Sequence, residues 1–186
     1  MEKGRLAARI AAPVLIAAAV VGIWFAKHRG AADDGADGGS VLEGLPERLR
    51  GADFSFEQTA AVDFAALAEF GIPFIMDFGS EDCPPCRRMA PDLRLIHDEY
   101  TGRAFVKYLD VWKYPAAADG LPLQVIPTQF FFLADGSPFV PDEALSADIP
   151  FLMYSSRETG GHTFTAHQGG LSAEELRRIL AAMGAE

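Results

Sequence analysis

Cysteine is scarce in this chain of 186 residues, which contains only Cys83 and Cys86, separated by Pro84 and Pro85. A disulfide-rich scaffold and a zinc site closed by four cysteines are therefore both excluded. A core without covalent staples is feasible, because 49% of the residues are hydrophobic and 11% are aromatic. Two thiols at this spacing fit a redox-active pair, part of a metal site, or a structural disulfide.

Basic residues are also scarce after residue 30, where 11 lysines and arginines accompany 25 aspartates and glutamates. The negative net charge of the chain after residue 30 argues against nucleic acid or an anionic membrane surface as a partner. Histidine is rare as well, and His97, His162 and His167 lack metal-ligand spacing relative to the cysteines. We therefore predict no bound metal and surface positions for these histidines.

Long hydrophobic runs are limited to one segment, Ile10–Ala26, which is free of charge for 17 residues and has basic residues on both sides. This pattern predicts that residues 1–28 are an uncleaved signal-anchor, a single transmembrane helix, in preference to a cleaved signal peptide. The basic N-terminus should remain in the cytoplasm and the body should be exported. Residues 29–52 begin with a Gly- and Asp-rich stretch and are predicted to be a flexible linker.

Residues 53–186 alternate between helical and strand patterns, which is typical of an α/β sheet with helices on its faces. Ser172 followed by Glu175 predicts a capping box at the start of the last helix. The predicted helices are 59–71, 84–100, 116–124 and 172–184, and the predicted strands are 72–79, 104–111, 128–137 and 162–168.

Cys83 should lie at a helix N-terminus, because Pro84 is well suited to the first helical turn. Unpaired N–H groups and the helix dipole stabilise a thiolate there, and the thiolate is the reactive form of cysteine. Cys86 lies one turn further along and should be more buried. We therefore predict that Cys83 attacks a substrate disulfide and Cys86 resolves the mixed disulfide.

Four further features accompany the cysteines, in an order that resembles the thioredoxin superfamily over roughly residues 58–186. "FIMDFGSEDCPPC" places Asp77 six residues before Cys83, and Pro91 follows Cys83 by eight. "VIPT" at Val125–Thr128 is similar to the cis-proline loop, and "HQGGLS" at His167–Ser172 to the glycine before the last helix. The resemblance implies a thioredoxin-like fold, a mixed central sheet with helices on both faces.

The resemblance also implies roles for individual residues. Asp77 would be a buried carboxylate that moves protons for the resolving thiol, with a pKa raised toward neutrality. Pro127 would be cis, and Ile126 and Thr128 would help to shape the substrate groove. The dipeptide between the cysteines, Pro84–Pro85, would tune the reduction potential.

Three other side chains have two interpretations each. Lys107 falls near a family lysine that can pair with the buried acid, but a solvated lysine at a strand end is equally expected. Trp112 and Tyr114 either line the substrate groove or cap the core.

The chain departs from the family in three respects. Pro84–Pro85 stands between the cysteines where Gly-Pro is common. Gly79 and Asp82 stand where tryptophans are common. Residues 137–161 form an insertion where a tight hairpin between the last two strands is usual. Its apolar residues could bury against the domain or offer a partner surface: Phe139, Phe151, Leu152, Met153 and Tyr154.

A long hairpin behind a membrane anchor resembles bacterial membrane-tethered thioredoxin-like proteins. This implies a membrane thiol-electron carrier of the cytochrome c biogenesis type as partner, together with protein thiols and disulfides as substrates. We expect a thiol–disulfide oxidoreductase on the outer side of the bacterial cytoplasmic membrane, reducing protein disulfides without a prosthetic group. The alternatives are a thiol oxidant or isomerase, and a non-catalytic module that carries metal or binds a partner.

Overall fold

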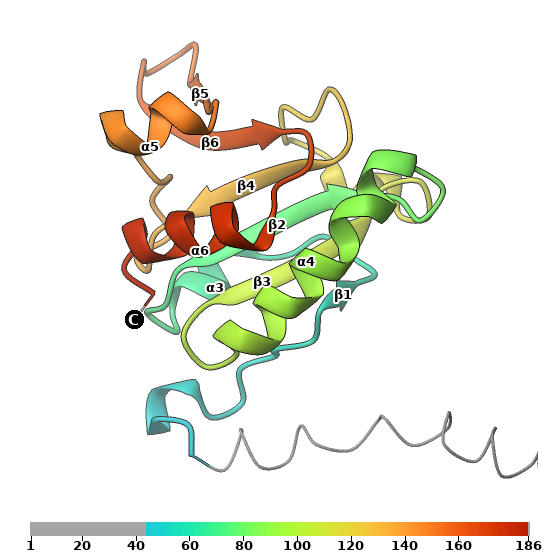
Figure 1. The fold of residues 1–186 in the computed structure, drawn as a ribbon. Coiled ribbons are helices and arrows are strands. Elements are labelled where there is room, and N and C mark those ends of the chain that lie inside the picture. Colours follow the sequence, from blue (N-terminus) through green and yellow to red (C-terminus); the bar gives the residue numbers. More distant parts are fainter. Residues whose placement is uncertain (1–43, 186) are drawn as a thin grey trace, which may run out of the picture. The chain divides into compact units, whose positions relative to one another are not determined.

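Six strands form one mixed sheet in the order β1-β3-β2-β4-β6-β5 in the computed structural model, which describes residues 44–185 (Figure 1). β1, β3 and β2 run parallel, whereas β4, β6 and β5 each run antiparallel to their inner neighbour. The strands are β1 Glu57–Gln58, β2 Phe74–Gly79, β3 Phe105–Asp110, β4 Thr128–Phe132, β5 Leu152–Ser155 and β6 His162–Gln168.

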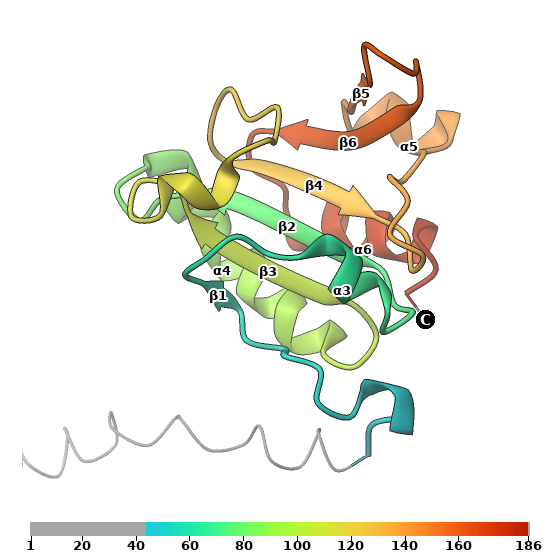
Figure 2. The same ribbon diagram turned by 180° about the vertical axis from the view of Figure 1, so that it is seen from behind.

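Helices cover both faces of this sheet, as predicted. α4 (Pro84–Tyr100) and α6 (Ala173–Ala182) lie on one face, and α3 (Phe64–Ala68) lies on the other (Figures 1 and 2). The alternation of strand residues divides the core accordingly: Ile75, Val106 and Phe131 pack under α4 and α6, while the phenylalanines of the opposite face pack under α3. The remaining elements are α5 (Glu143–Asp148) and two 3₁₀ turns, η1 (Glu47–Leu49) and η2 (Pro115–Ala118).

Two predicted helix signals are confirmed. α4 buries Met89, Leu93 and Ile96 at helical spacing against the sheet. At the start of α6, the amide of Glu175 donates to Ser172 Oγ at 3.3 Å, and the amide of Ser172 donates to Glu175 Oε2 at 2.8 Å. This capping box satisfies amides that the helix itself leaves without partners.

The folded unit begins at Leu45, so the predicted boundary at residue 53 is too late. Leu49 is only 1% exposed in the core, and the side chain of Leu45 lies against Gly102. Burial of these leucines explains why the last eight residues of the predicted 29–52 linker belong to the fold. The predicted signal-anchor, residues 1–28, and the rest of the linker lie outside the described residues; no helix within 44–185 is long and apolar enough to span a membrane.

Two predicted helices are shorter than expected. α3 covers only residues 64–68 of the predicted 59–71, because the Asp63 carboxylate caps the amides of Ala65 and Ala66 and fixes the start. The predicted helix 116–124 is reduced to η2, and Gly120 follows it with φ of +82°. Only glycine adopts this left-handed conformation readily, so the helix cannot continue.

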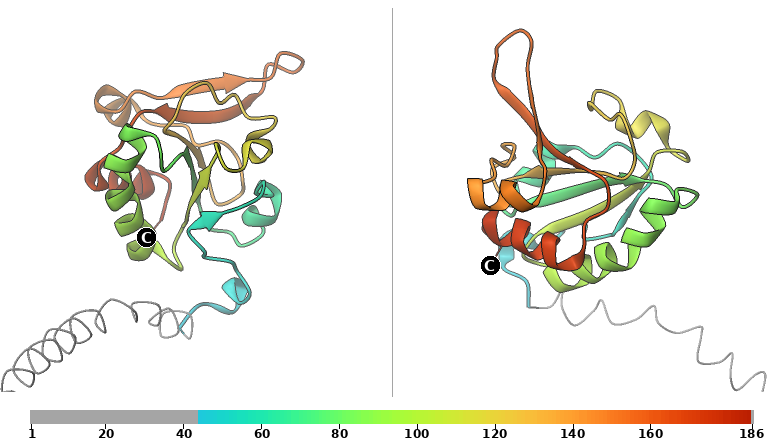
Figure 3. Two further views of the ribbon diagram at one scale, coloured as in Figure 1. Left: turned by 90° about the vertical axis from the view of Figure 1, so that its right-hand side faces the viewer. Right: turned by 45° about the horizontal axis from the view of Figure 1, so that its top comes forward.

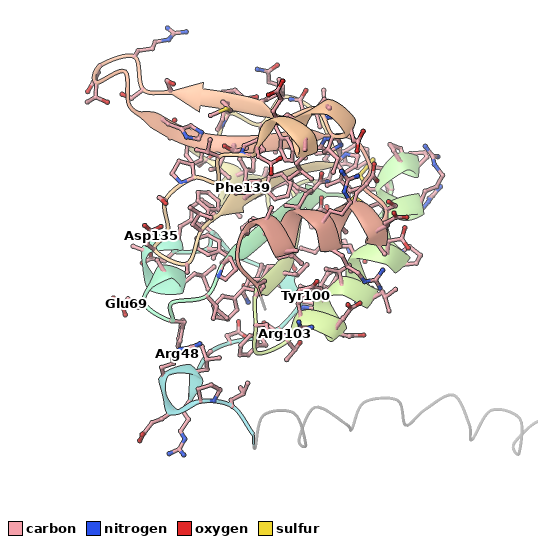
Figure 4. All side chains as sticks on the ribbon, turned by 60° about the vertical axis from the view of Figure 1, so that its left-hand side comes forward. Arg48, Glu69, Tyr100, Arg103, Asp135 and Phe139 are labelled. Atoms are coloured by element: carbon pink, nitrogen blue, oxygen red, sulfur yellow. A yellow bond between two sulfur atoms is a disulfide. The ribbon has the colours of Figure 1, made fainter. Side chains whose placement is uncertain are left out.

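Residues 137–161 form α5 and the edge strand β5. Phe139, labelled in Figure 4, is buried together with Leu145 and Ile149, and these residues pack into the core on the α4–α6 side. Leu152 and Met153 of β5 remain 41% and 53% exposed. Part of the segment is therefore buried against the domain, as one of the two expectations had it, while a role of the exposed residues as a partner surface stays a prediction. The hairpin of β5 and β6 projects from the rest of the domain (Figure 3).

Candidate active site

Cys83 and Cys86 form a disulfide at the N-terminus of α4, with their Cα atoms 5.3 Å apart. Cys83 is the N-cap residue, and its Sγ accepts a hydrogen bond from the amide of Cys86 at 3.4 Å. Both are buried, with exposures of 4% and 6%, so the expectation that Cys86 is the more buried is wrong. Cys83 is covered because the Ile126 carbonyl oxygen lies 3.8 Å from its sulfur.

Several groups around the pair favour a thiolate on Cys83 after reduction, whereas the exposed carboxylate of Asp82, directly before Cys83, opposes it. The amides at the start of α4 and the positive end of its dipole point at this sulfur. The competing acid Glu81 is ion-paired with Lys113, which offsets its negative charge. Arg87 and Arg88 lie one turn into the helix and add positive charge.

The cis-proline loop lies beside Cys83, and the Ile126–Pro127 peptide bond is cis, as predicted. Thr128 is 1% exposed, and its hydroxyl donates to the Val125 carbonyl at 2.7 Å. Thr128 therefore fixes the loop from inside, while Val125, at 50% exposure, presents an apolar surface.

Asp77 is buried at the centre of β2, opposite Tyr108 of β3 and Gln129 of β4. Burial raises the pKa of Asp77 to about 7, and the hydrogen bond from Gln129 Nε2 to Oδ1, at 2.7 Å, opposes that rise. Asp77 and Cys86 line the same cavity, of about 150 Å³, beneath α4. A carboxylate with a pKa of about 7 thus lines the same space as Cys86.

Lys107 does not approach Asp77, and both interpretations of this lysine are wrong. Its register partner on β2 is Met76, so its side chain points to the opposite face of the sheet. It is 2% exposed, and Nζ donates to the carbonyls of Asp53 and Ser55 at 2.8 and 3.1 Å. Burial lowers the pKa of Lys107, and its structural role is to fasten the segment before β1.

Tyr108 and Gly79 form a pair that sequence reasoning missed. A Cβ atom on Gly79 would lie 3.0 Å from the Tyr108 ring and 3.4 Å from Cys86 Sγ. Tyr108 thus occupies the space beside the cavity where a side chain at residue 79 would otherwise lie. The glycine at residue 79, where the family commonly has tryptophan, indicated that another side chain fills this space. The sequence did not reveal that this side chain is Tyr108.

The loop after β3 is held by Asp110, whose carboxylate accepts hydrogen bonds from the amides of Glu81, Trp112 and Lys113 at 2.9–3.1 Å. These bonds lower the pKa of Asp110 against the effect of its burial. Trp112 is 61% exposed, which contradicts the expectation that it caps the core. Trp112 and Tyr114 instead add exposed aromatic surface to the loop.

The surface expectation for the histidines is wrong for His167, which is 7% exposed. Its Nδ1–H donates to the Pro150 carbonyl at 2.9 Å, because a carbonyl can only accept. The segment 137–161 thus contributes to the burial of His167 through Pro150, and Gln129 of β4 lies opposite His167 in the sheet. Within residues 44–185, no three histidine, cysteine, aspartate or glutamate side chains are grouped as metal ligands.

Comparisons with known proteins identify relatives of this chain. The thioredoxin family model matches residues 57–148. Thioredoxin of Staphylococcus aureus is 34% identical over 90 residues, which is 45% of this chain and 85% of that protein. The chain belongs to the thioredoxin family. Its family membership and its Cys83–Cys86 pair make it a thiol–disulfide oxidoreductase.

Solved structures of two thioredoxins are also similar to this member of the thioredoxin family. Chloroplastic thioredoxin z is 20% identical, with a TM-score of 0.45, covering 69% of this chain and 96% of that chain. Malassezia sympodialis thioredoxin (Mala s 13) is 16% identical, with a TM-score of 0.47, covering 70% of this chain and 92% of that chain.

Proposed function

We propose that this protein reduces disulfides in other proteins, outside the cytoplasm, while tethered to the bacterial cytoplasmic membrane. The observation that carries the redox part is the Cys83–Cys86 disulfide at the N-terminus of α4, beside the cis-Pro127 loop. The dithiol itself supplies the two electrons, so no prosthetic group is required.

The reaction begins with the Cys83 thiolate, which attacks one sulfur of the substrate disulfide. The substrate S–S bond breaks, one substrate thiolate leaves, and a mixed disulfide with Cys83 forms. Cys86 then loses its proton and attacks Cys83 Sγ, which releases the second substrate thiolate. The protein is oxidised to the Cys83–Cys86 disulfide, and the substrate has gained two electrons and takes up two protons.

Asp77 acts as the proton acceptor for Cys86 in the second step. Two observations support this role: Asp77 and Cys86 line the same cavity, and the pKa of Asp77 is about 7. A general base is most effective when its pKa lies near the working pH. Pro84 and Pro85 between the cysteines set the reduction potential through the geometry of the first helical turn.

The substrate backbone binds beside the cis-proline loop as an added strand. Ile126 contributes its carbonyl next to Cys83, Pro127 shapes the loop, and Thr128 fixes it from within. Exposed apolar side chains at Val125 and Trp112 provide further contact area.

The proposed tether is residues 1–28, followed by residues 29–44 as a linker. The evidence for the tether is the uncharged run Ile10–Ala26 between basic flanks. A reductant outside the cytoplasm must be re-reduced, and a membrane thiol-electron carrier of the cytochrome c biogenesis type is the proposed source of electrons.

The reduction potential of the pair tests this function. In a glutathione or dithiothreitol series, we expect a value near or below about −250 mV, the thioredoxin range. A value above about −180 mV would instead identify an oxidant or isomerase. A pair that never cycles would reject the redox role and favour metal carriage or binding.

Trapping tests the assigned order of the cysteines. Cys86→Ser should accumulate mixed disulfides with cellular proteins, because the resolving step is lost. Cys83→Ser should accumulate none, and equal trapping by both variants would contradict the order.

A further inference from the structure

Gln129 lies between the buried acid and the proline loop, although nothing in the sequence marked it as functional. It is the direct register partner of Asp77 across β2 and β4. Directly opposed residues of an antiparallel pair project from the same face, with Cβ atoms about 5 Å apart. The strand register alone therefore places the amide of Gln129 beside the carboxyl of Asp77.

The Gln129 amide has a defined orientation. Nε2 donates to Asp77 Oδ1 at 2.7 Å and to the Gly169 carbonyl at 3.2 Å, so each of its two hydrogens has an oxygen acceptor. The opposite amide orientation would place Oε1 against two acceptors. The Pro127 carbonyl accepts from the Gly169 amide at 2.9 Å, so these bonds also connect the acid with the substrate loop.

Packing does not account for a glutamine at this position. Gln129 is 0% exposed, and its Oε1 has no hydrogen-bond partner among the described residues. Glutamine is rarely so buried, and an unpaired buried carbonyl is unfavourable, so an apolar side chain would serve the core better. What the amide provides is a donor aimed at one oxygen of Asp77.

We propose that Gln129 is a positioning residue that holds the Asp77 carboxylate ready to accept the proton of Cys86. Because Gln129 occupies Oδ1, the proton from Cys86 Sγ is received on Oδ2. The hydrogen bond also stabilises the charged form of Asp77, which counteracts burial and keeps the carboxylate available as a base. This inference rests on the proposed function, since it concerns the step in which Cys86 becomes a nucleophile.

Other titratable groups lie around the Asp77 carboxyl and the Gln129 amide. They come from β3, β6, α4 and the loop after β2, and none of them belongs to β4. Gln129 is opposite His167 on β6, whose ring signals can be followed separately. The others line the cavity with Asp77: Tyr108 of β3, Glu81 of the loop after β2, and Cys86, Arg87 and Arg94 of α4. Titration of the oxidised protein removes Cys86 from this set, because a disulfide does not ionise.

The first test compares Gln129→Met with Gln168→Met in the oxidised full chain, by carboxyl carbon NMR of Asp77. Gln168 follows His167 on β6 and projects from the opposite face, so it is a matched control. In Gln129→Met the pKa of Asp77 should rise by about one unit, because a hydrogen bond to the charged form is lost. In Gln168→Met the midpoint should not move. An unchanged midpoint in Gln129→Met overturns the proposal.

The second test needs no variant and remains decisive if Gln129→Met fails to fold. In the wild-type protein, the side-chain amide signals of Gln129 should shift with the same midpoint as the Asp77 carboxyl. Amide signals that do not respond at this midpoint overturn the proposal.

The third test follows release of substrate from the mixed disulfide as a function of pH. The midpoint of the rate should move upward with that of Asp77 in Gln129→Met and stay in place in Gln168→Met. If the wild-type protein never releases substrate, the proposed function itself fails. If it does, and Gln129→Met has the wild-type pH profile, only the positioning role fails.

Discussion

Asp77 should make the stability of the oxidised protein strongly dependent on pH. Its pKa is about 7 in the folded protein, whereas the ordinary pKa of an aspartate side chain is 3.8, so the two differ by about three units. Each unit corresponds to about 1.4 kcal/mol, so ionised Asp77 costs about 4 kcal/mol relative to the same group in the unfolded chain. The group is an acid with a raised pKa, so stability is fully present below pH 3.8 and is lost as the pH rises through 7.

Asp77→Asn removes this titration while keeping the size of the side chain. Between pH 5 and pH 8.5 the wild-type free energy of unfolding should fall by about 3 kcal/mol more than that of Asp77→Asn. The measurement is urea denaturation of both oxidised proteins across this range. Only the pH dependence of the difference is diagnostic, because the substitution also changes hydrogen bonding to Gln129. Parallel curves for the two proteins would refute the reasoning.

An exposed aspartate provides the control for this experiment. Asp135, labelled in Figure 4, lies in the turn after β4, and hydrogen bonds from Ser137 lower its pKa. Asp135→Asn should therefore destabilise the protein rather than stabilise it. Its effect should be constant from pH 6 to pH 8.5, because the carboxyl is ionised throughout that range.

Three further predictions concern one residue beside the site and two that stabilise the fold. Gly79→Ala should destabilise the protein by about 1–3 kcal/mol, because the new methyl group lies 3.0 Å from the Tyr108 ring; urea denaturation checks this, and an unchanged midpoint would contradict it. Ser172→Ala should lower the free energy of unfolding by about 1 kcal/mol through loss of the helix cap, and a neutral result would contradict this role for the capping box. Lys107→Met should release the segment 53–55, so amide exchange there should accelerate in a hydrogen-exchange experiment, with protection in α4 unaltered.

Local chemistry made the centre of the site predictable from the sequence. A proline after Cys83 fixes where α4 begins, and the capping box fixes where α6 begins, so both helices were located without any knowledge of tertiary contacts. The run "FIMDFG" is wholly buried, as expected for a central strand, and this explains the environment of Asp77.

Predictions that needed strand register or tertiary contacts failed. Gln129 sits in the run "TQFFF", and only the pairing of β4 with β2 shows that it faces Asp77. Lys107 is one residue from the position facing Asp77, and a shift of one residue moves a side chain to the other face of the sheet. His167 is buried and bonded to the Pro150 carbonyl, a tertiary contact that no local pattern could reveal.

The point at which the chain enters the folded unit lies at the far end of α4 from the disulfide. Leu45 lies against Gly102, just beyond the C-terminal end of α4, whereas Cys83 caps the N-terminal end of the same helix. Seventeen helical residues separate these ends, which corresponds to about 25 Å. The chain therefore enters the folded unit at the end of α4 opposite the reactive sulfurs.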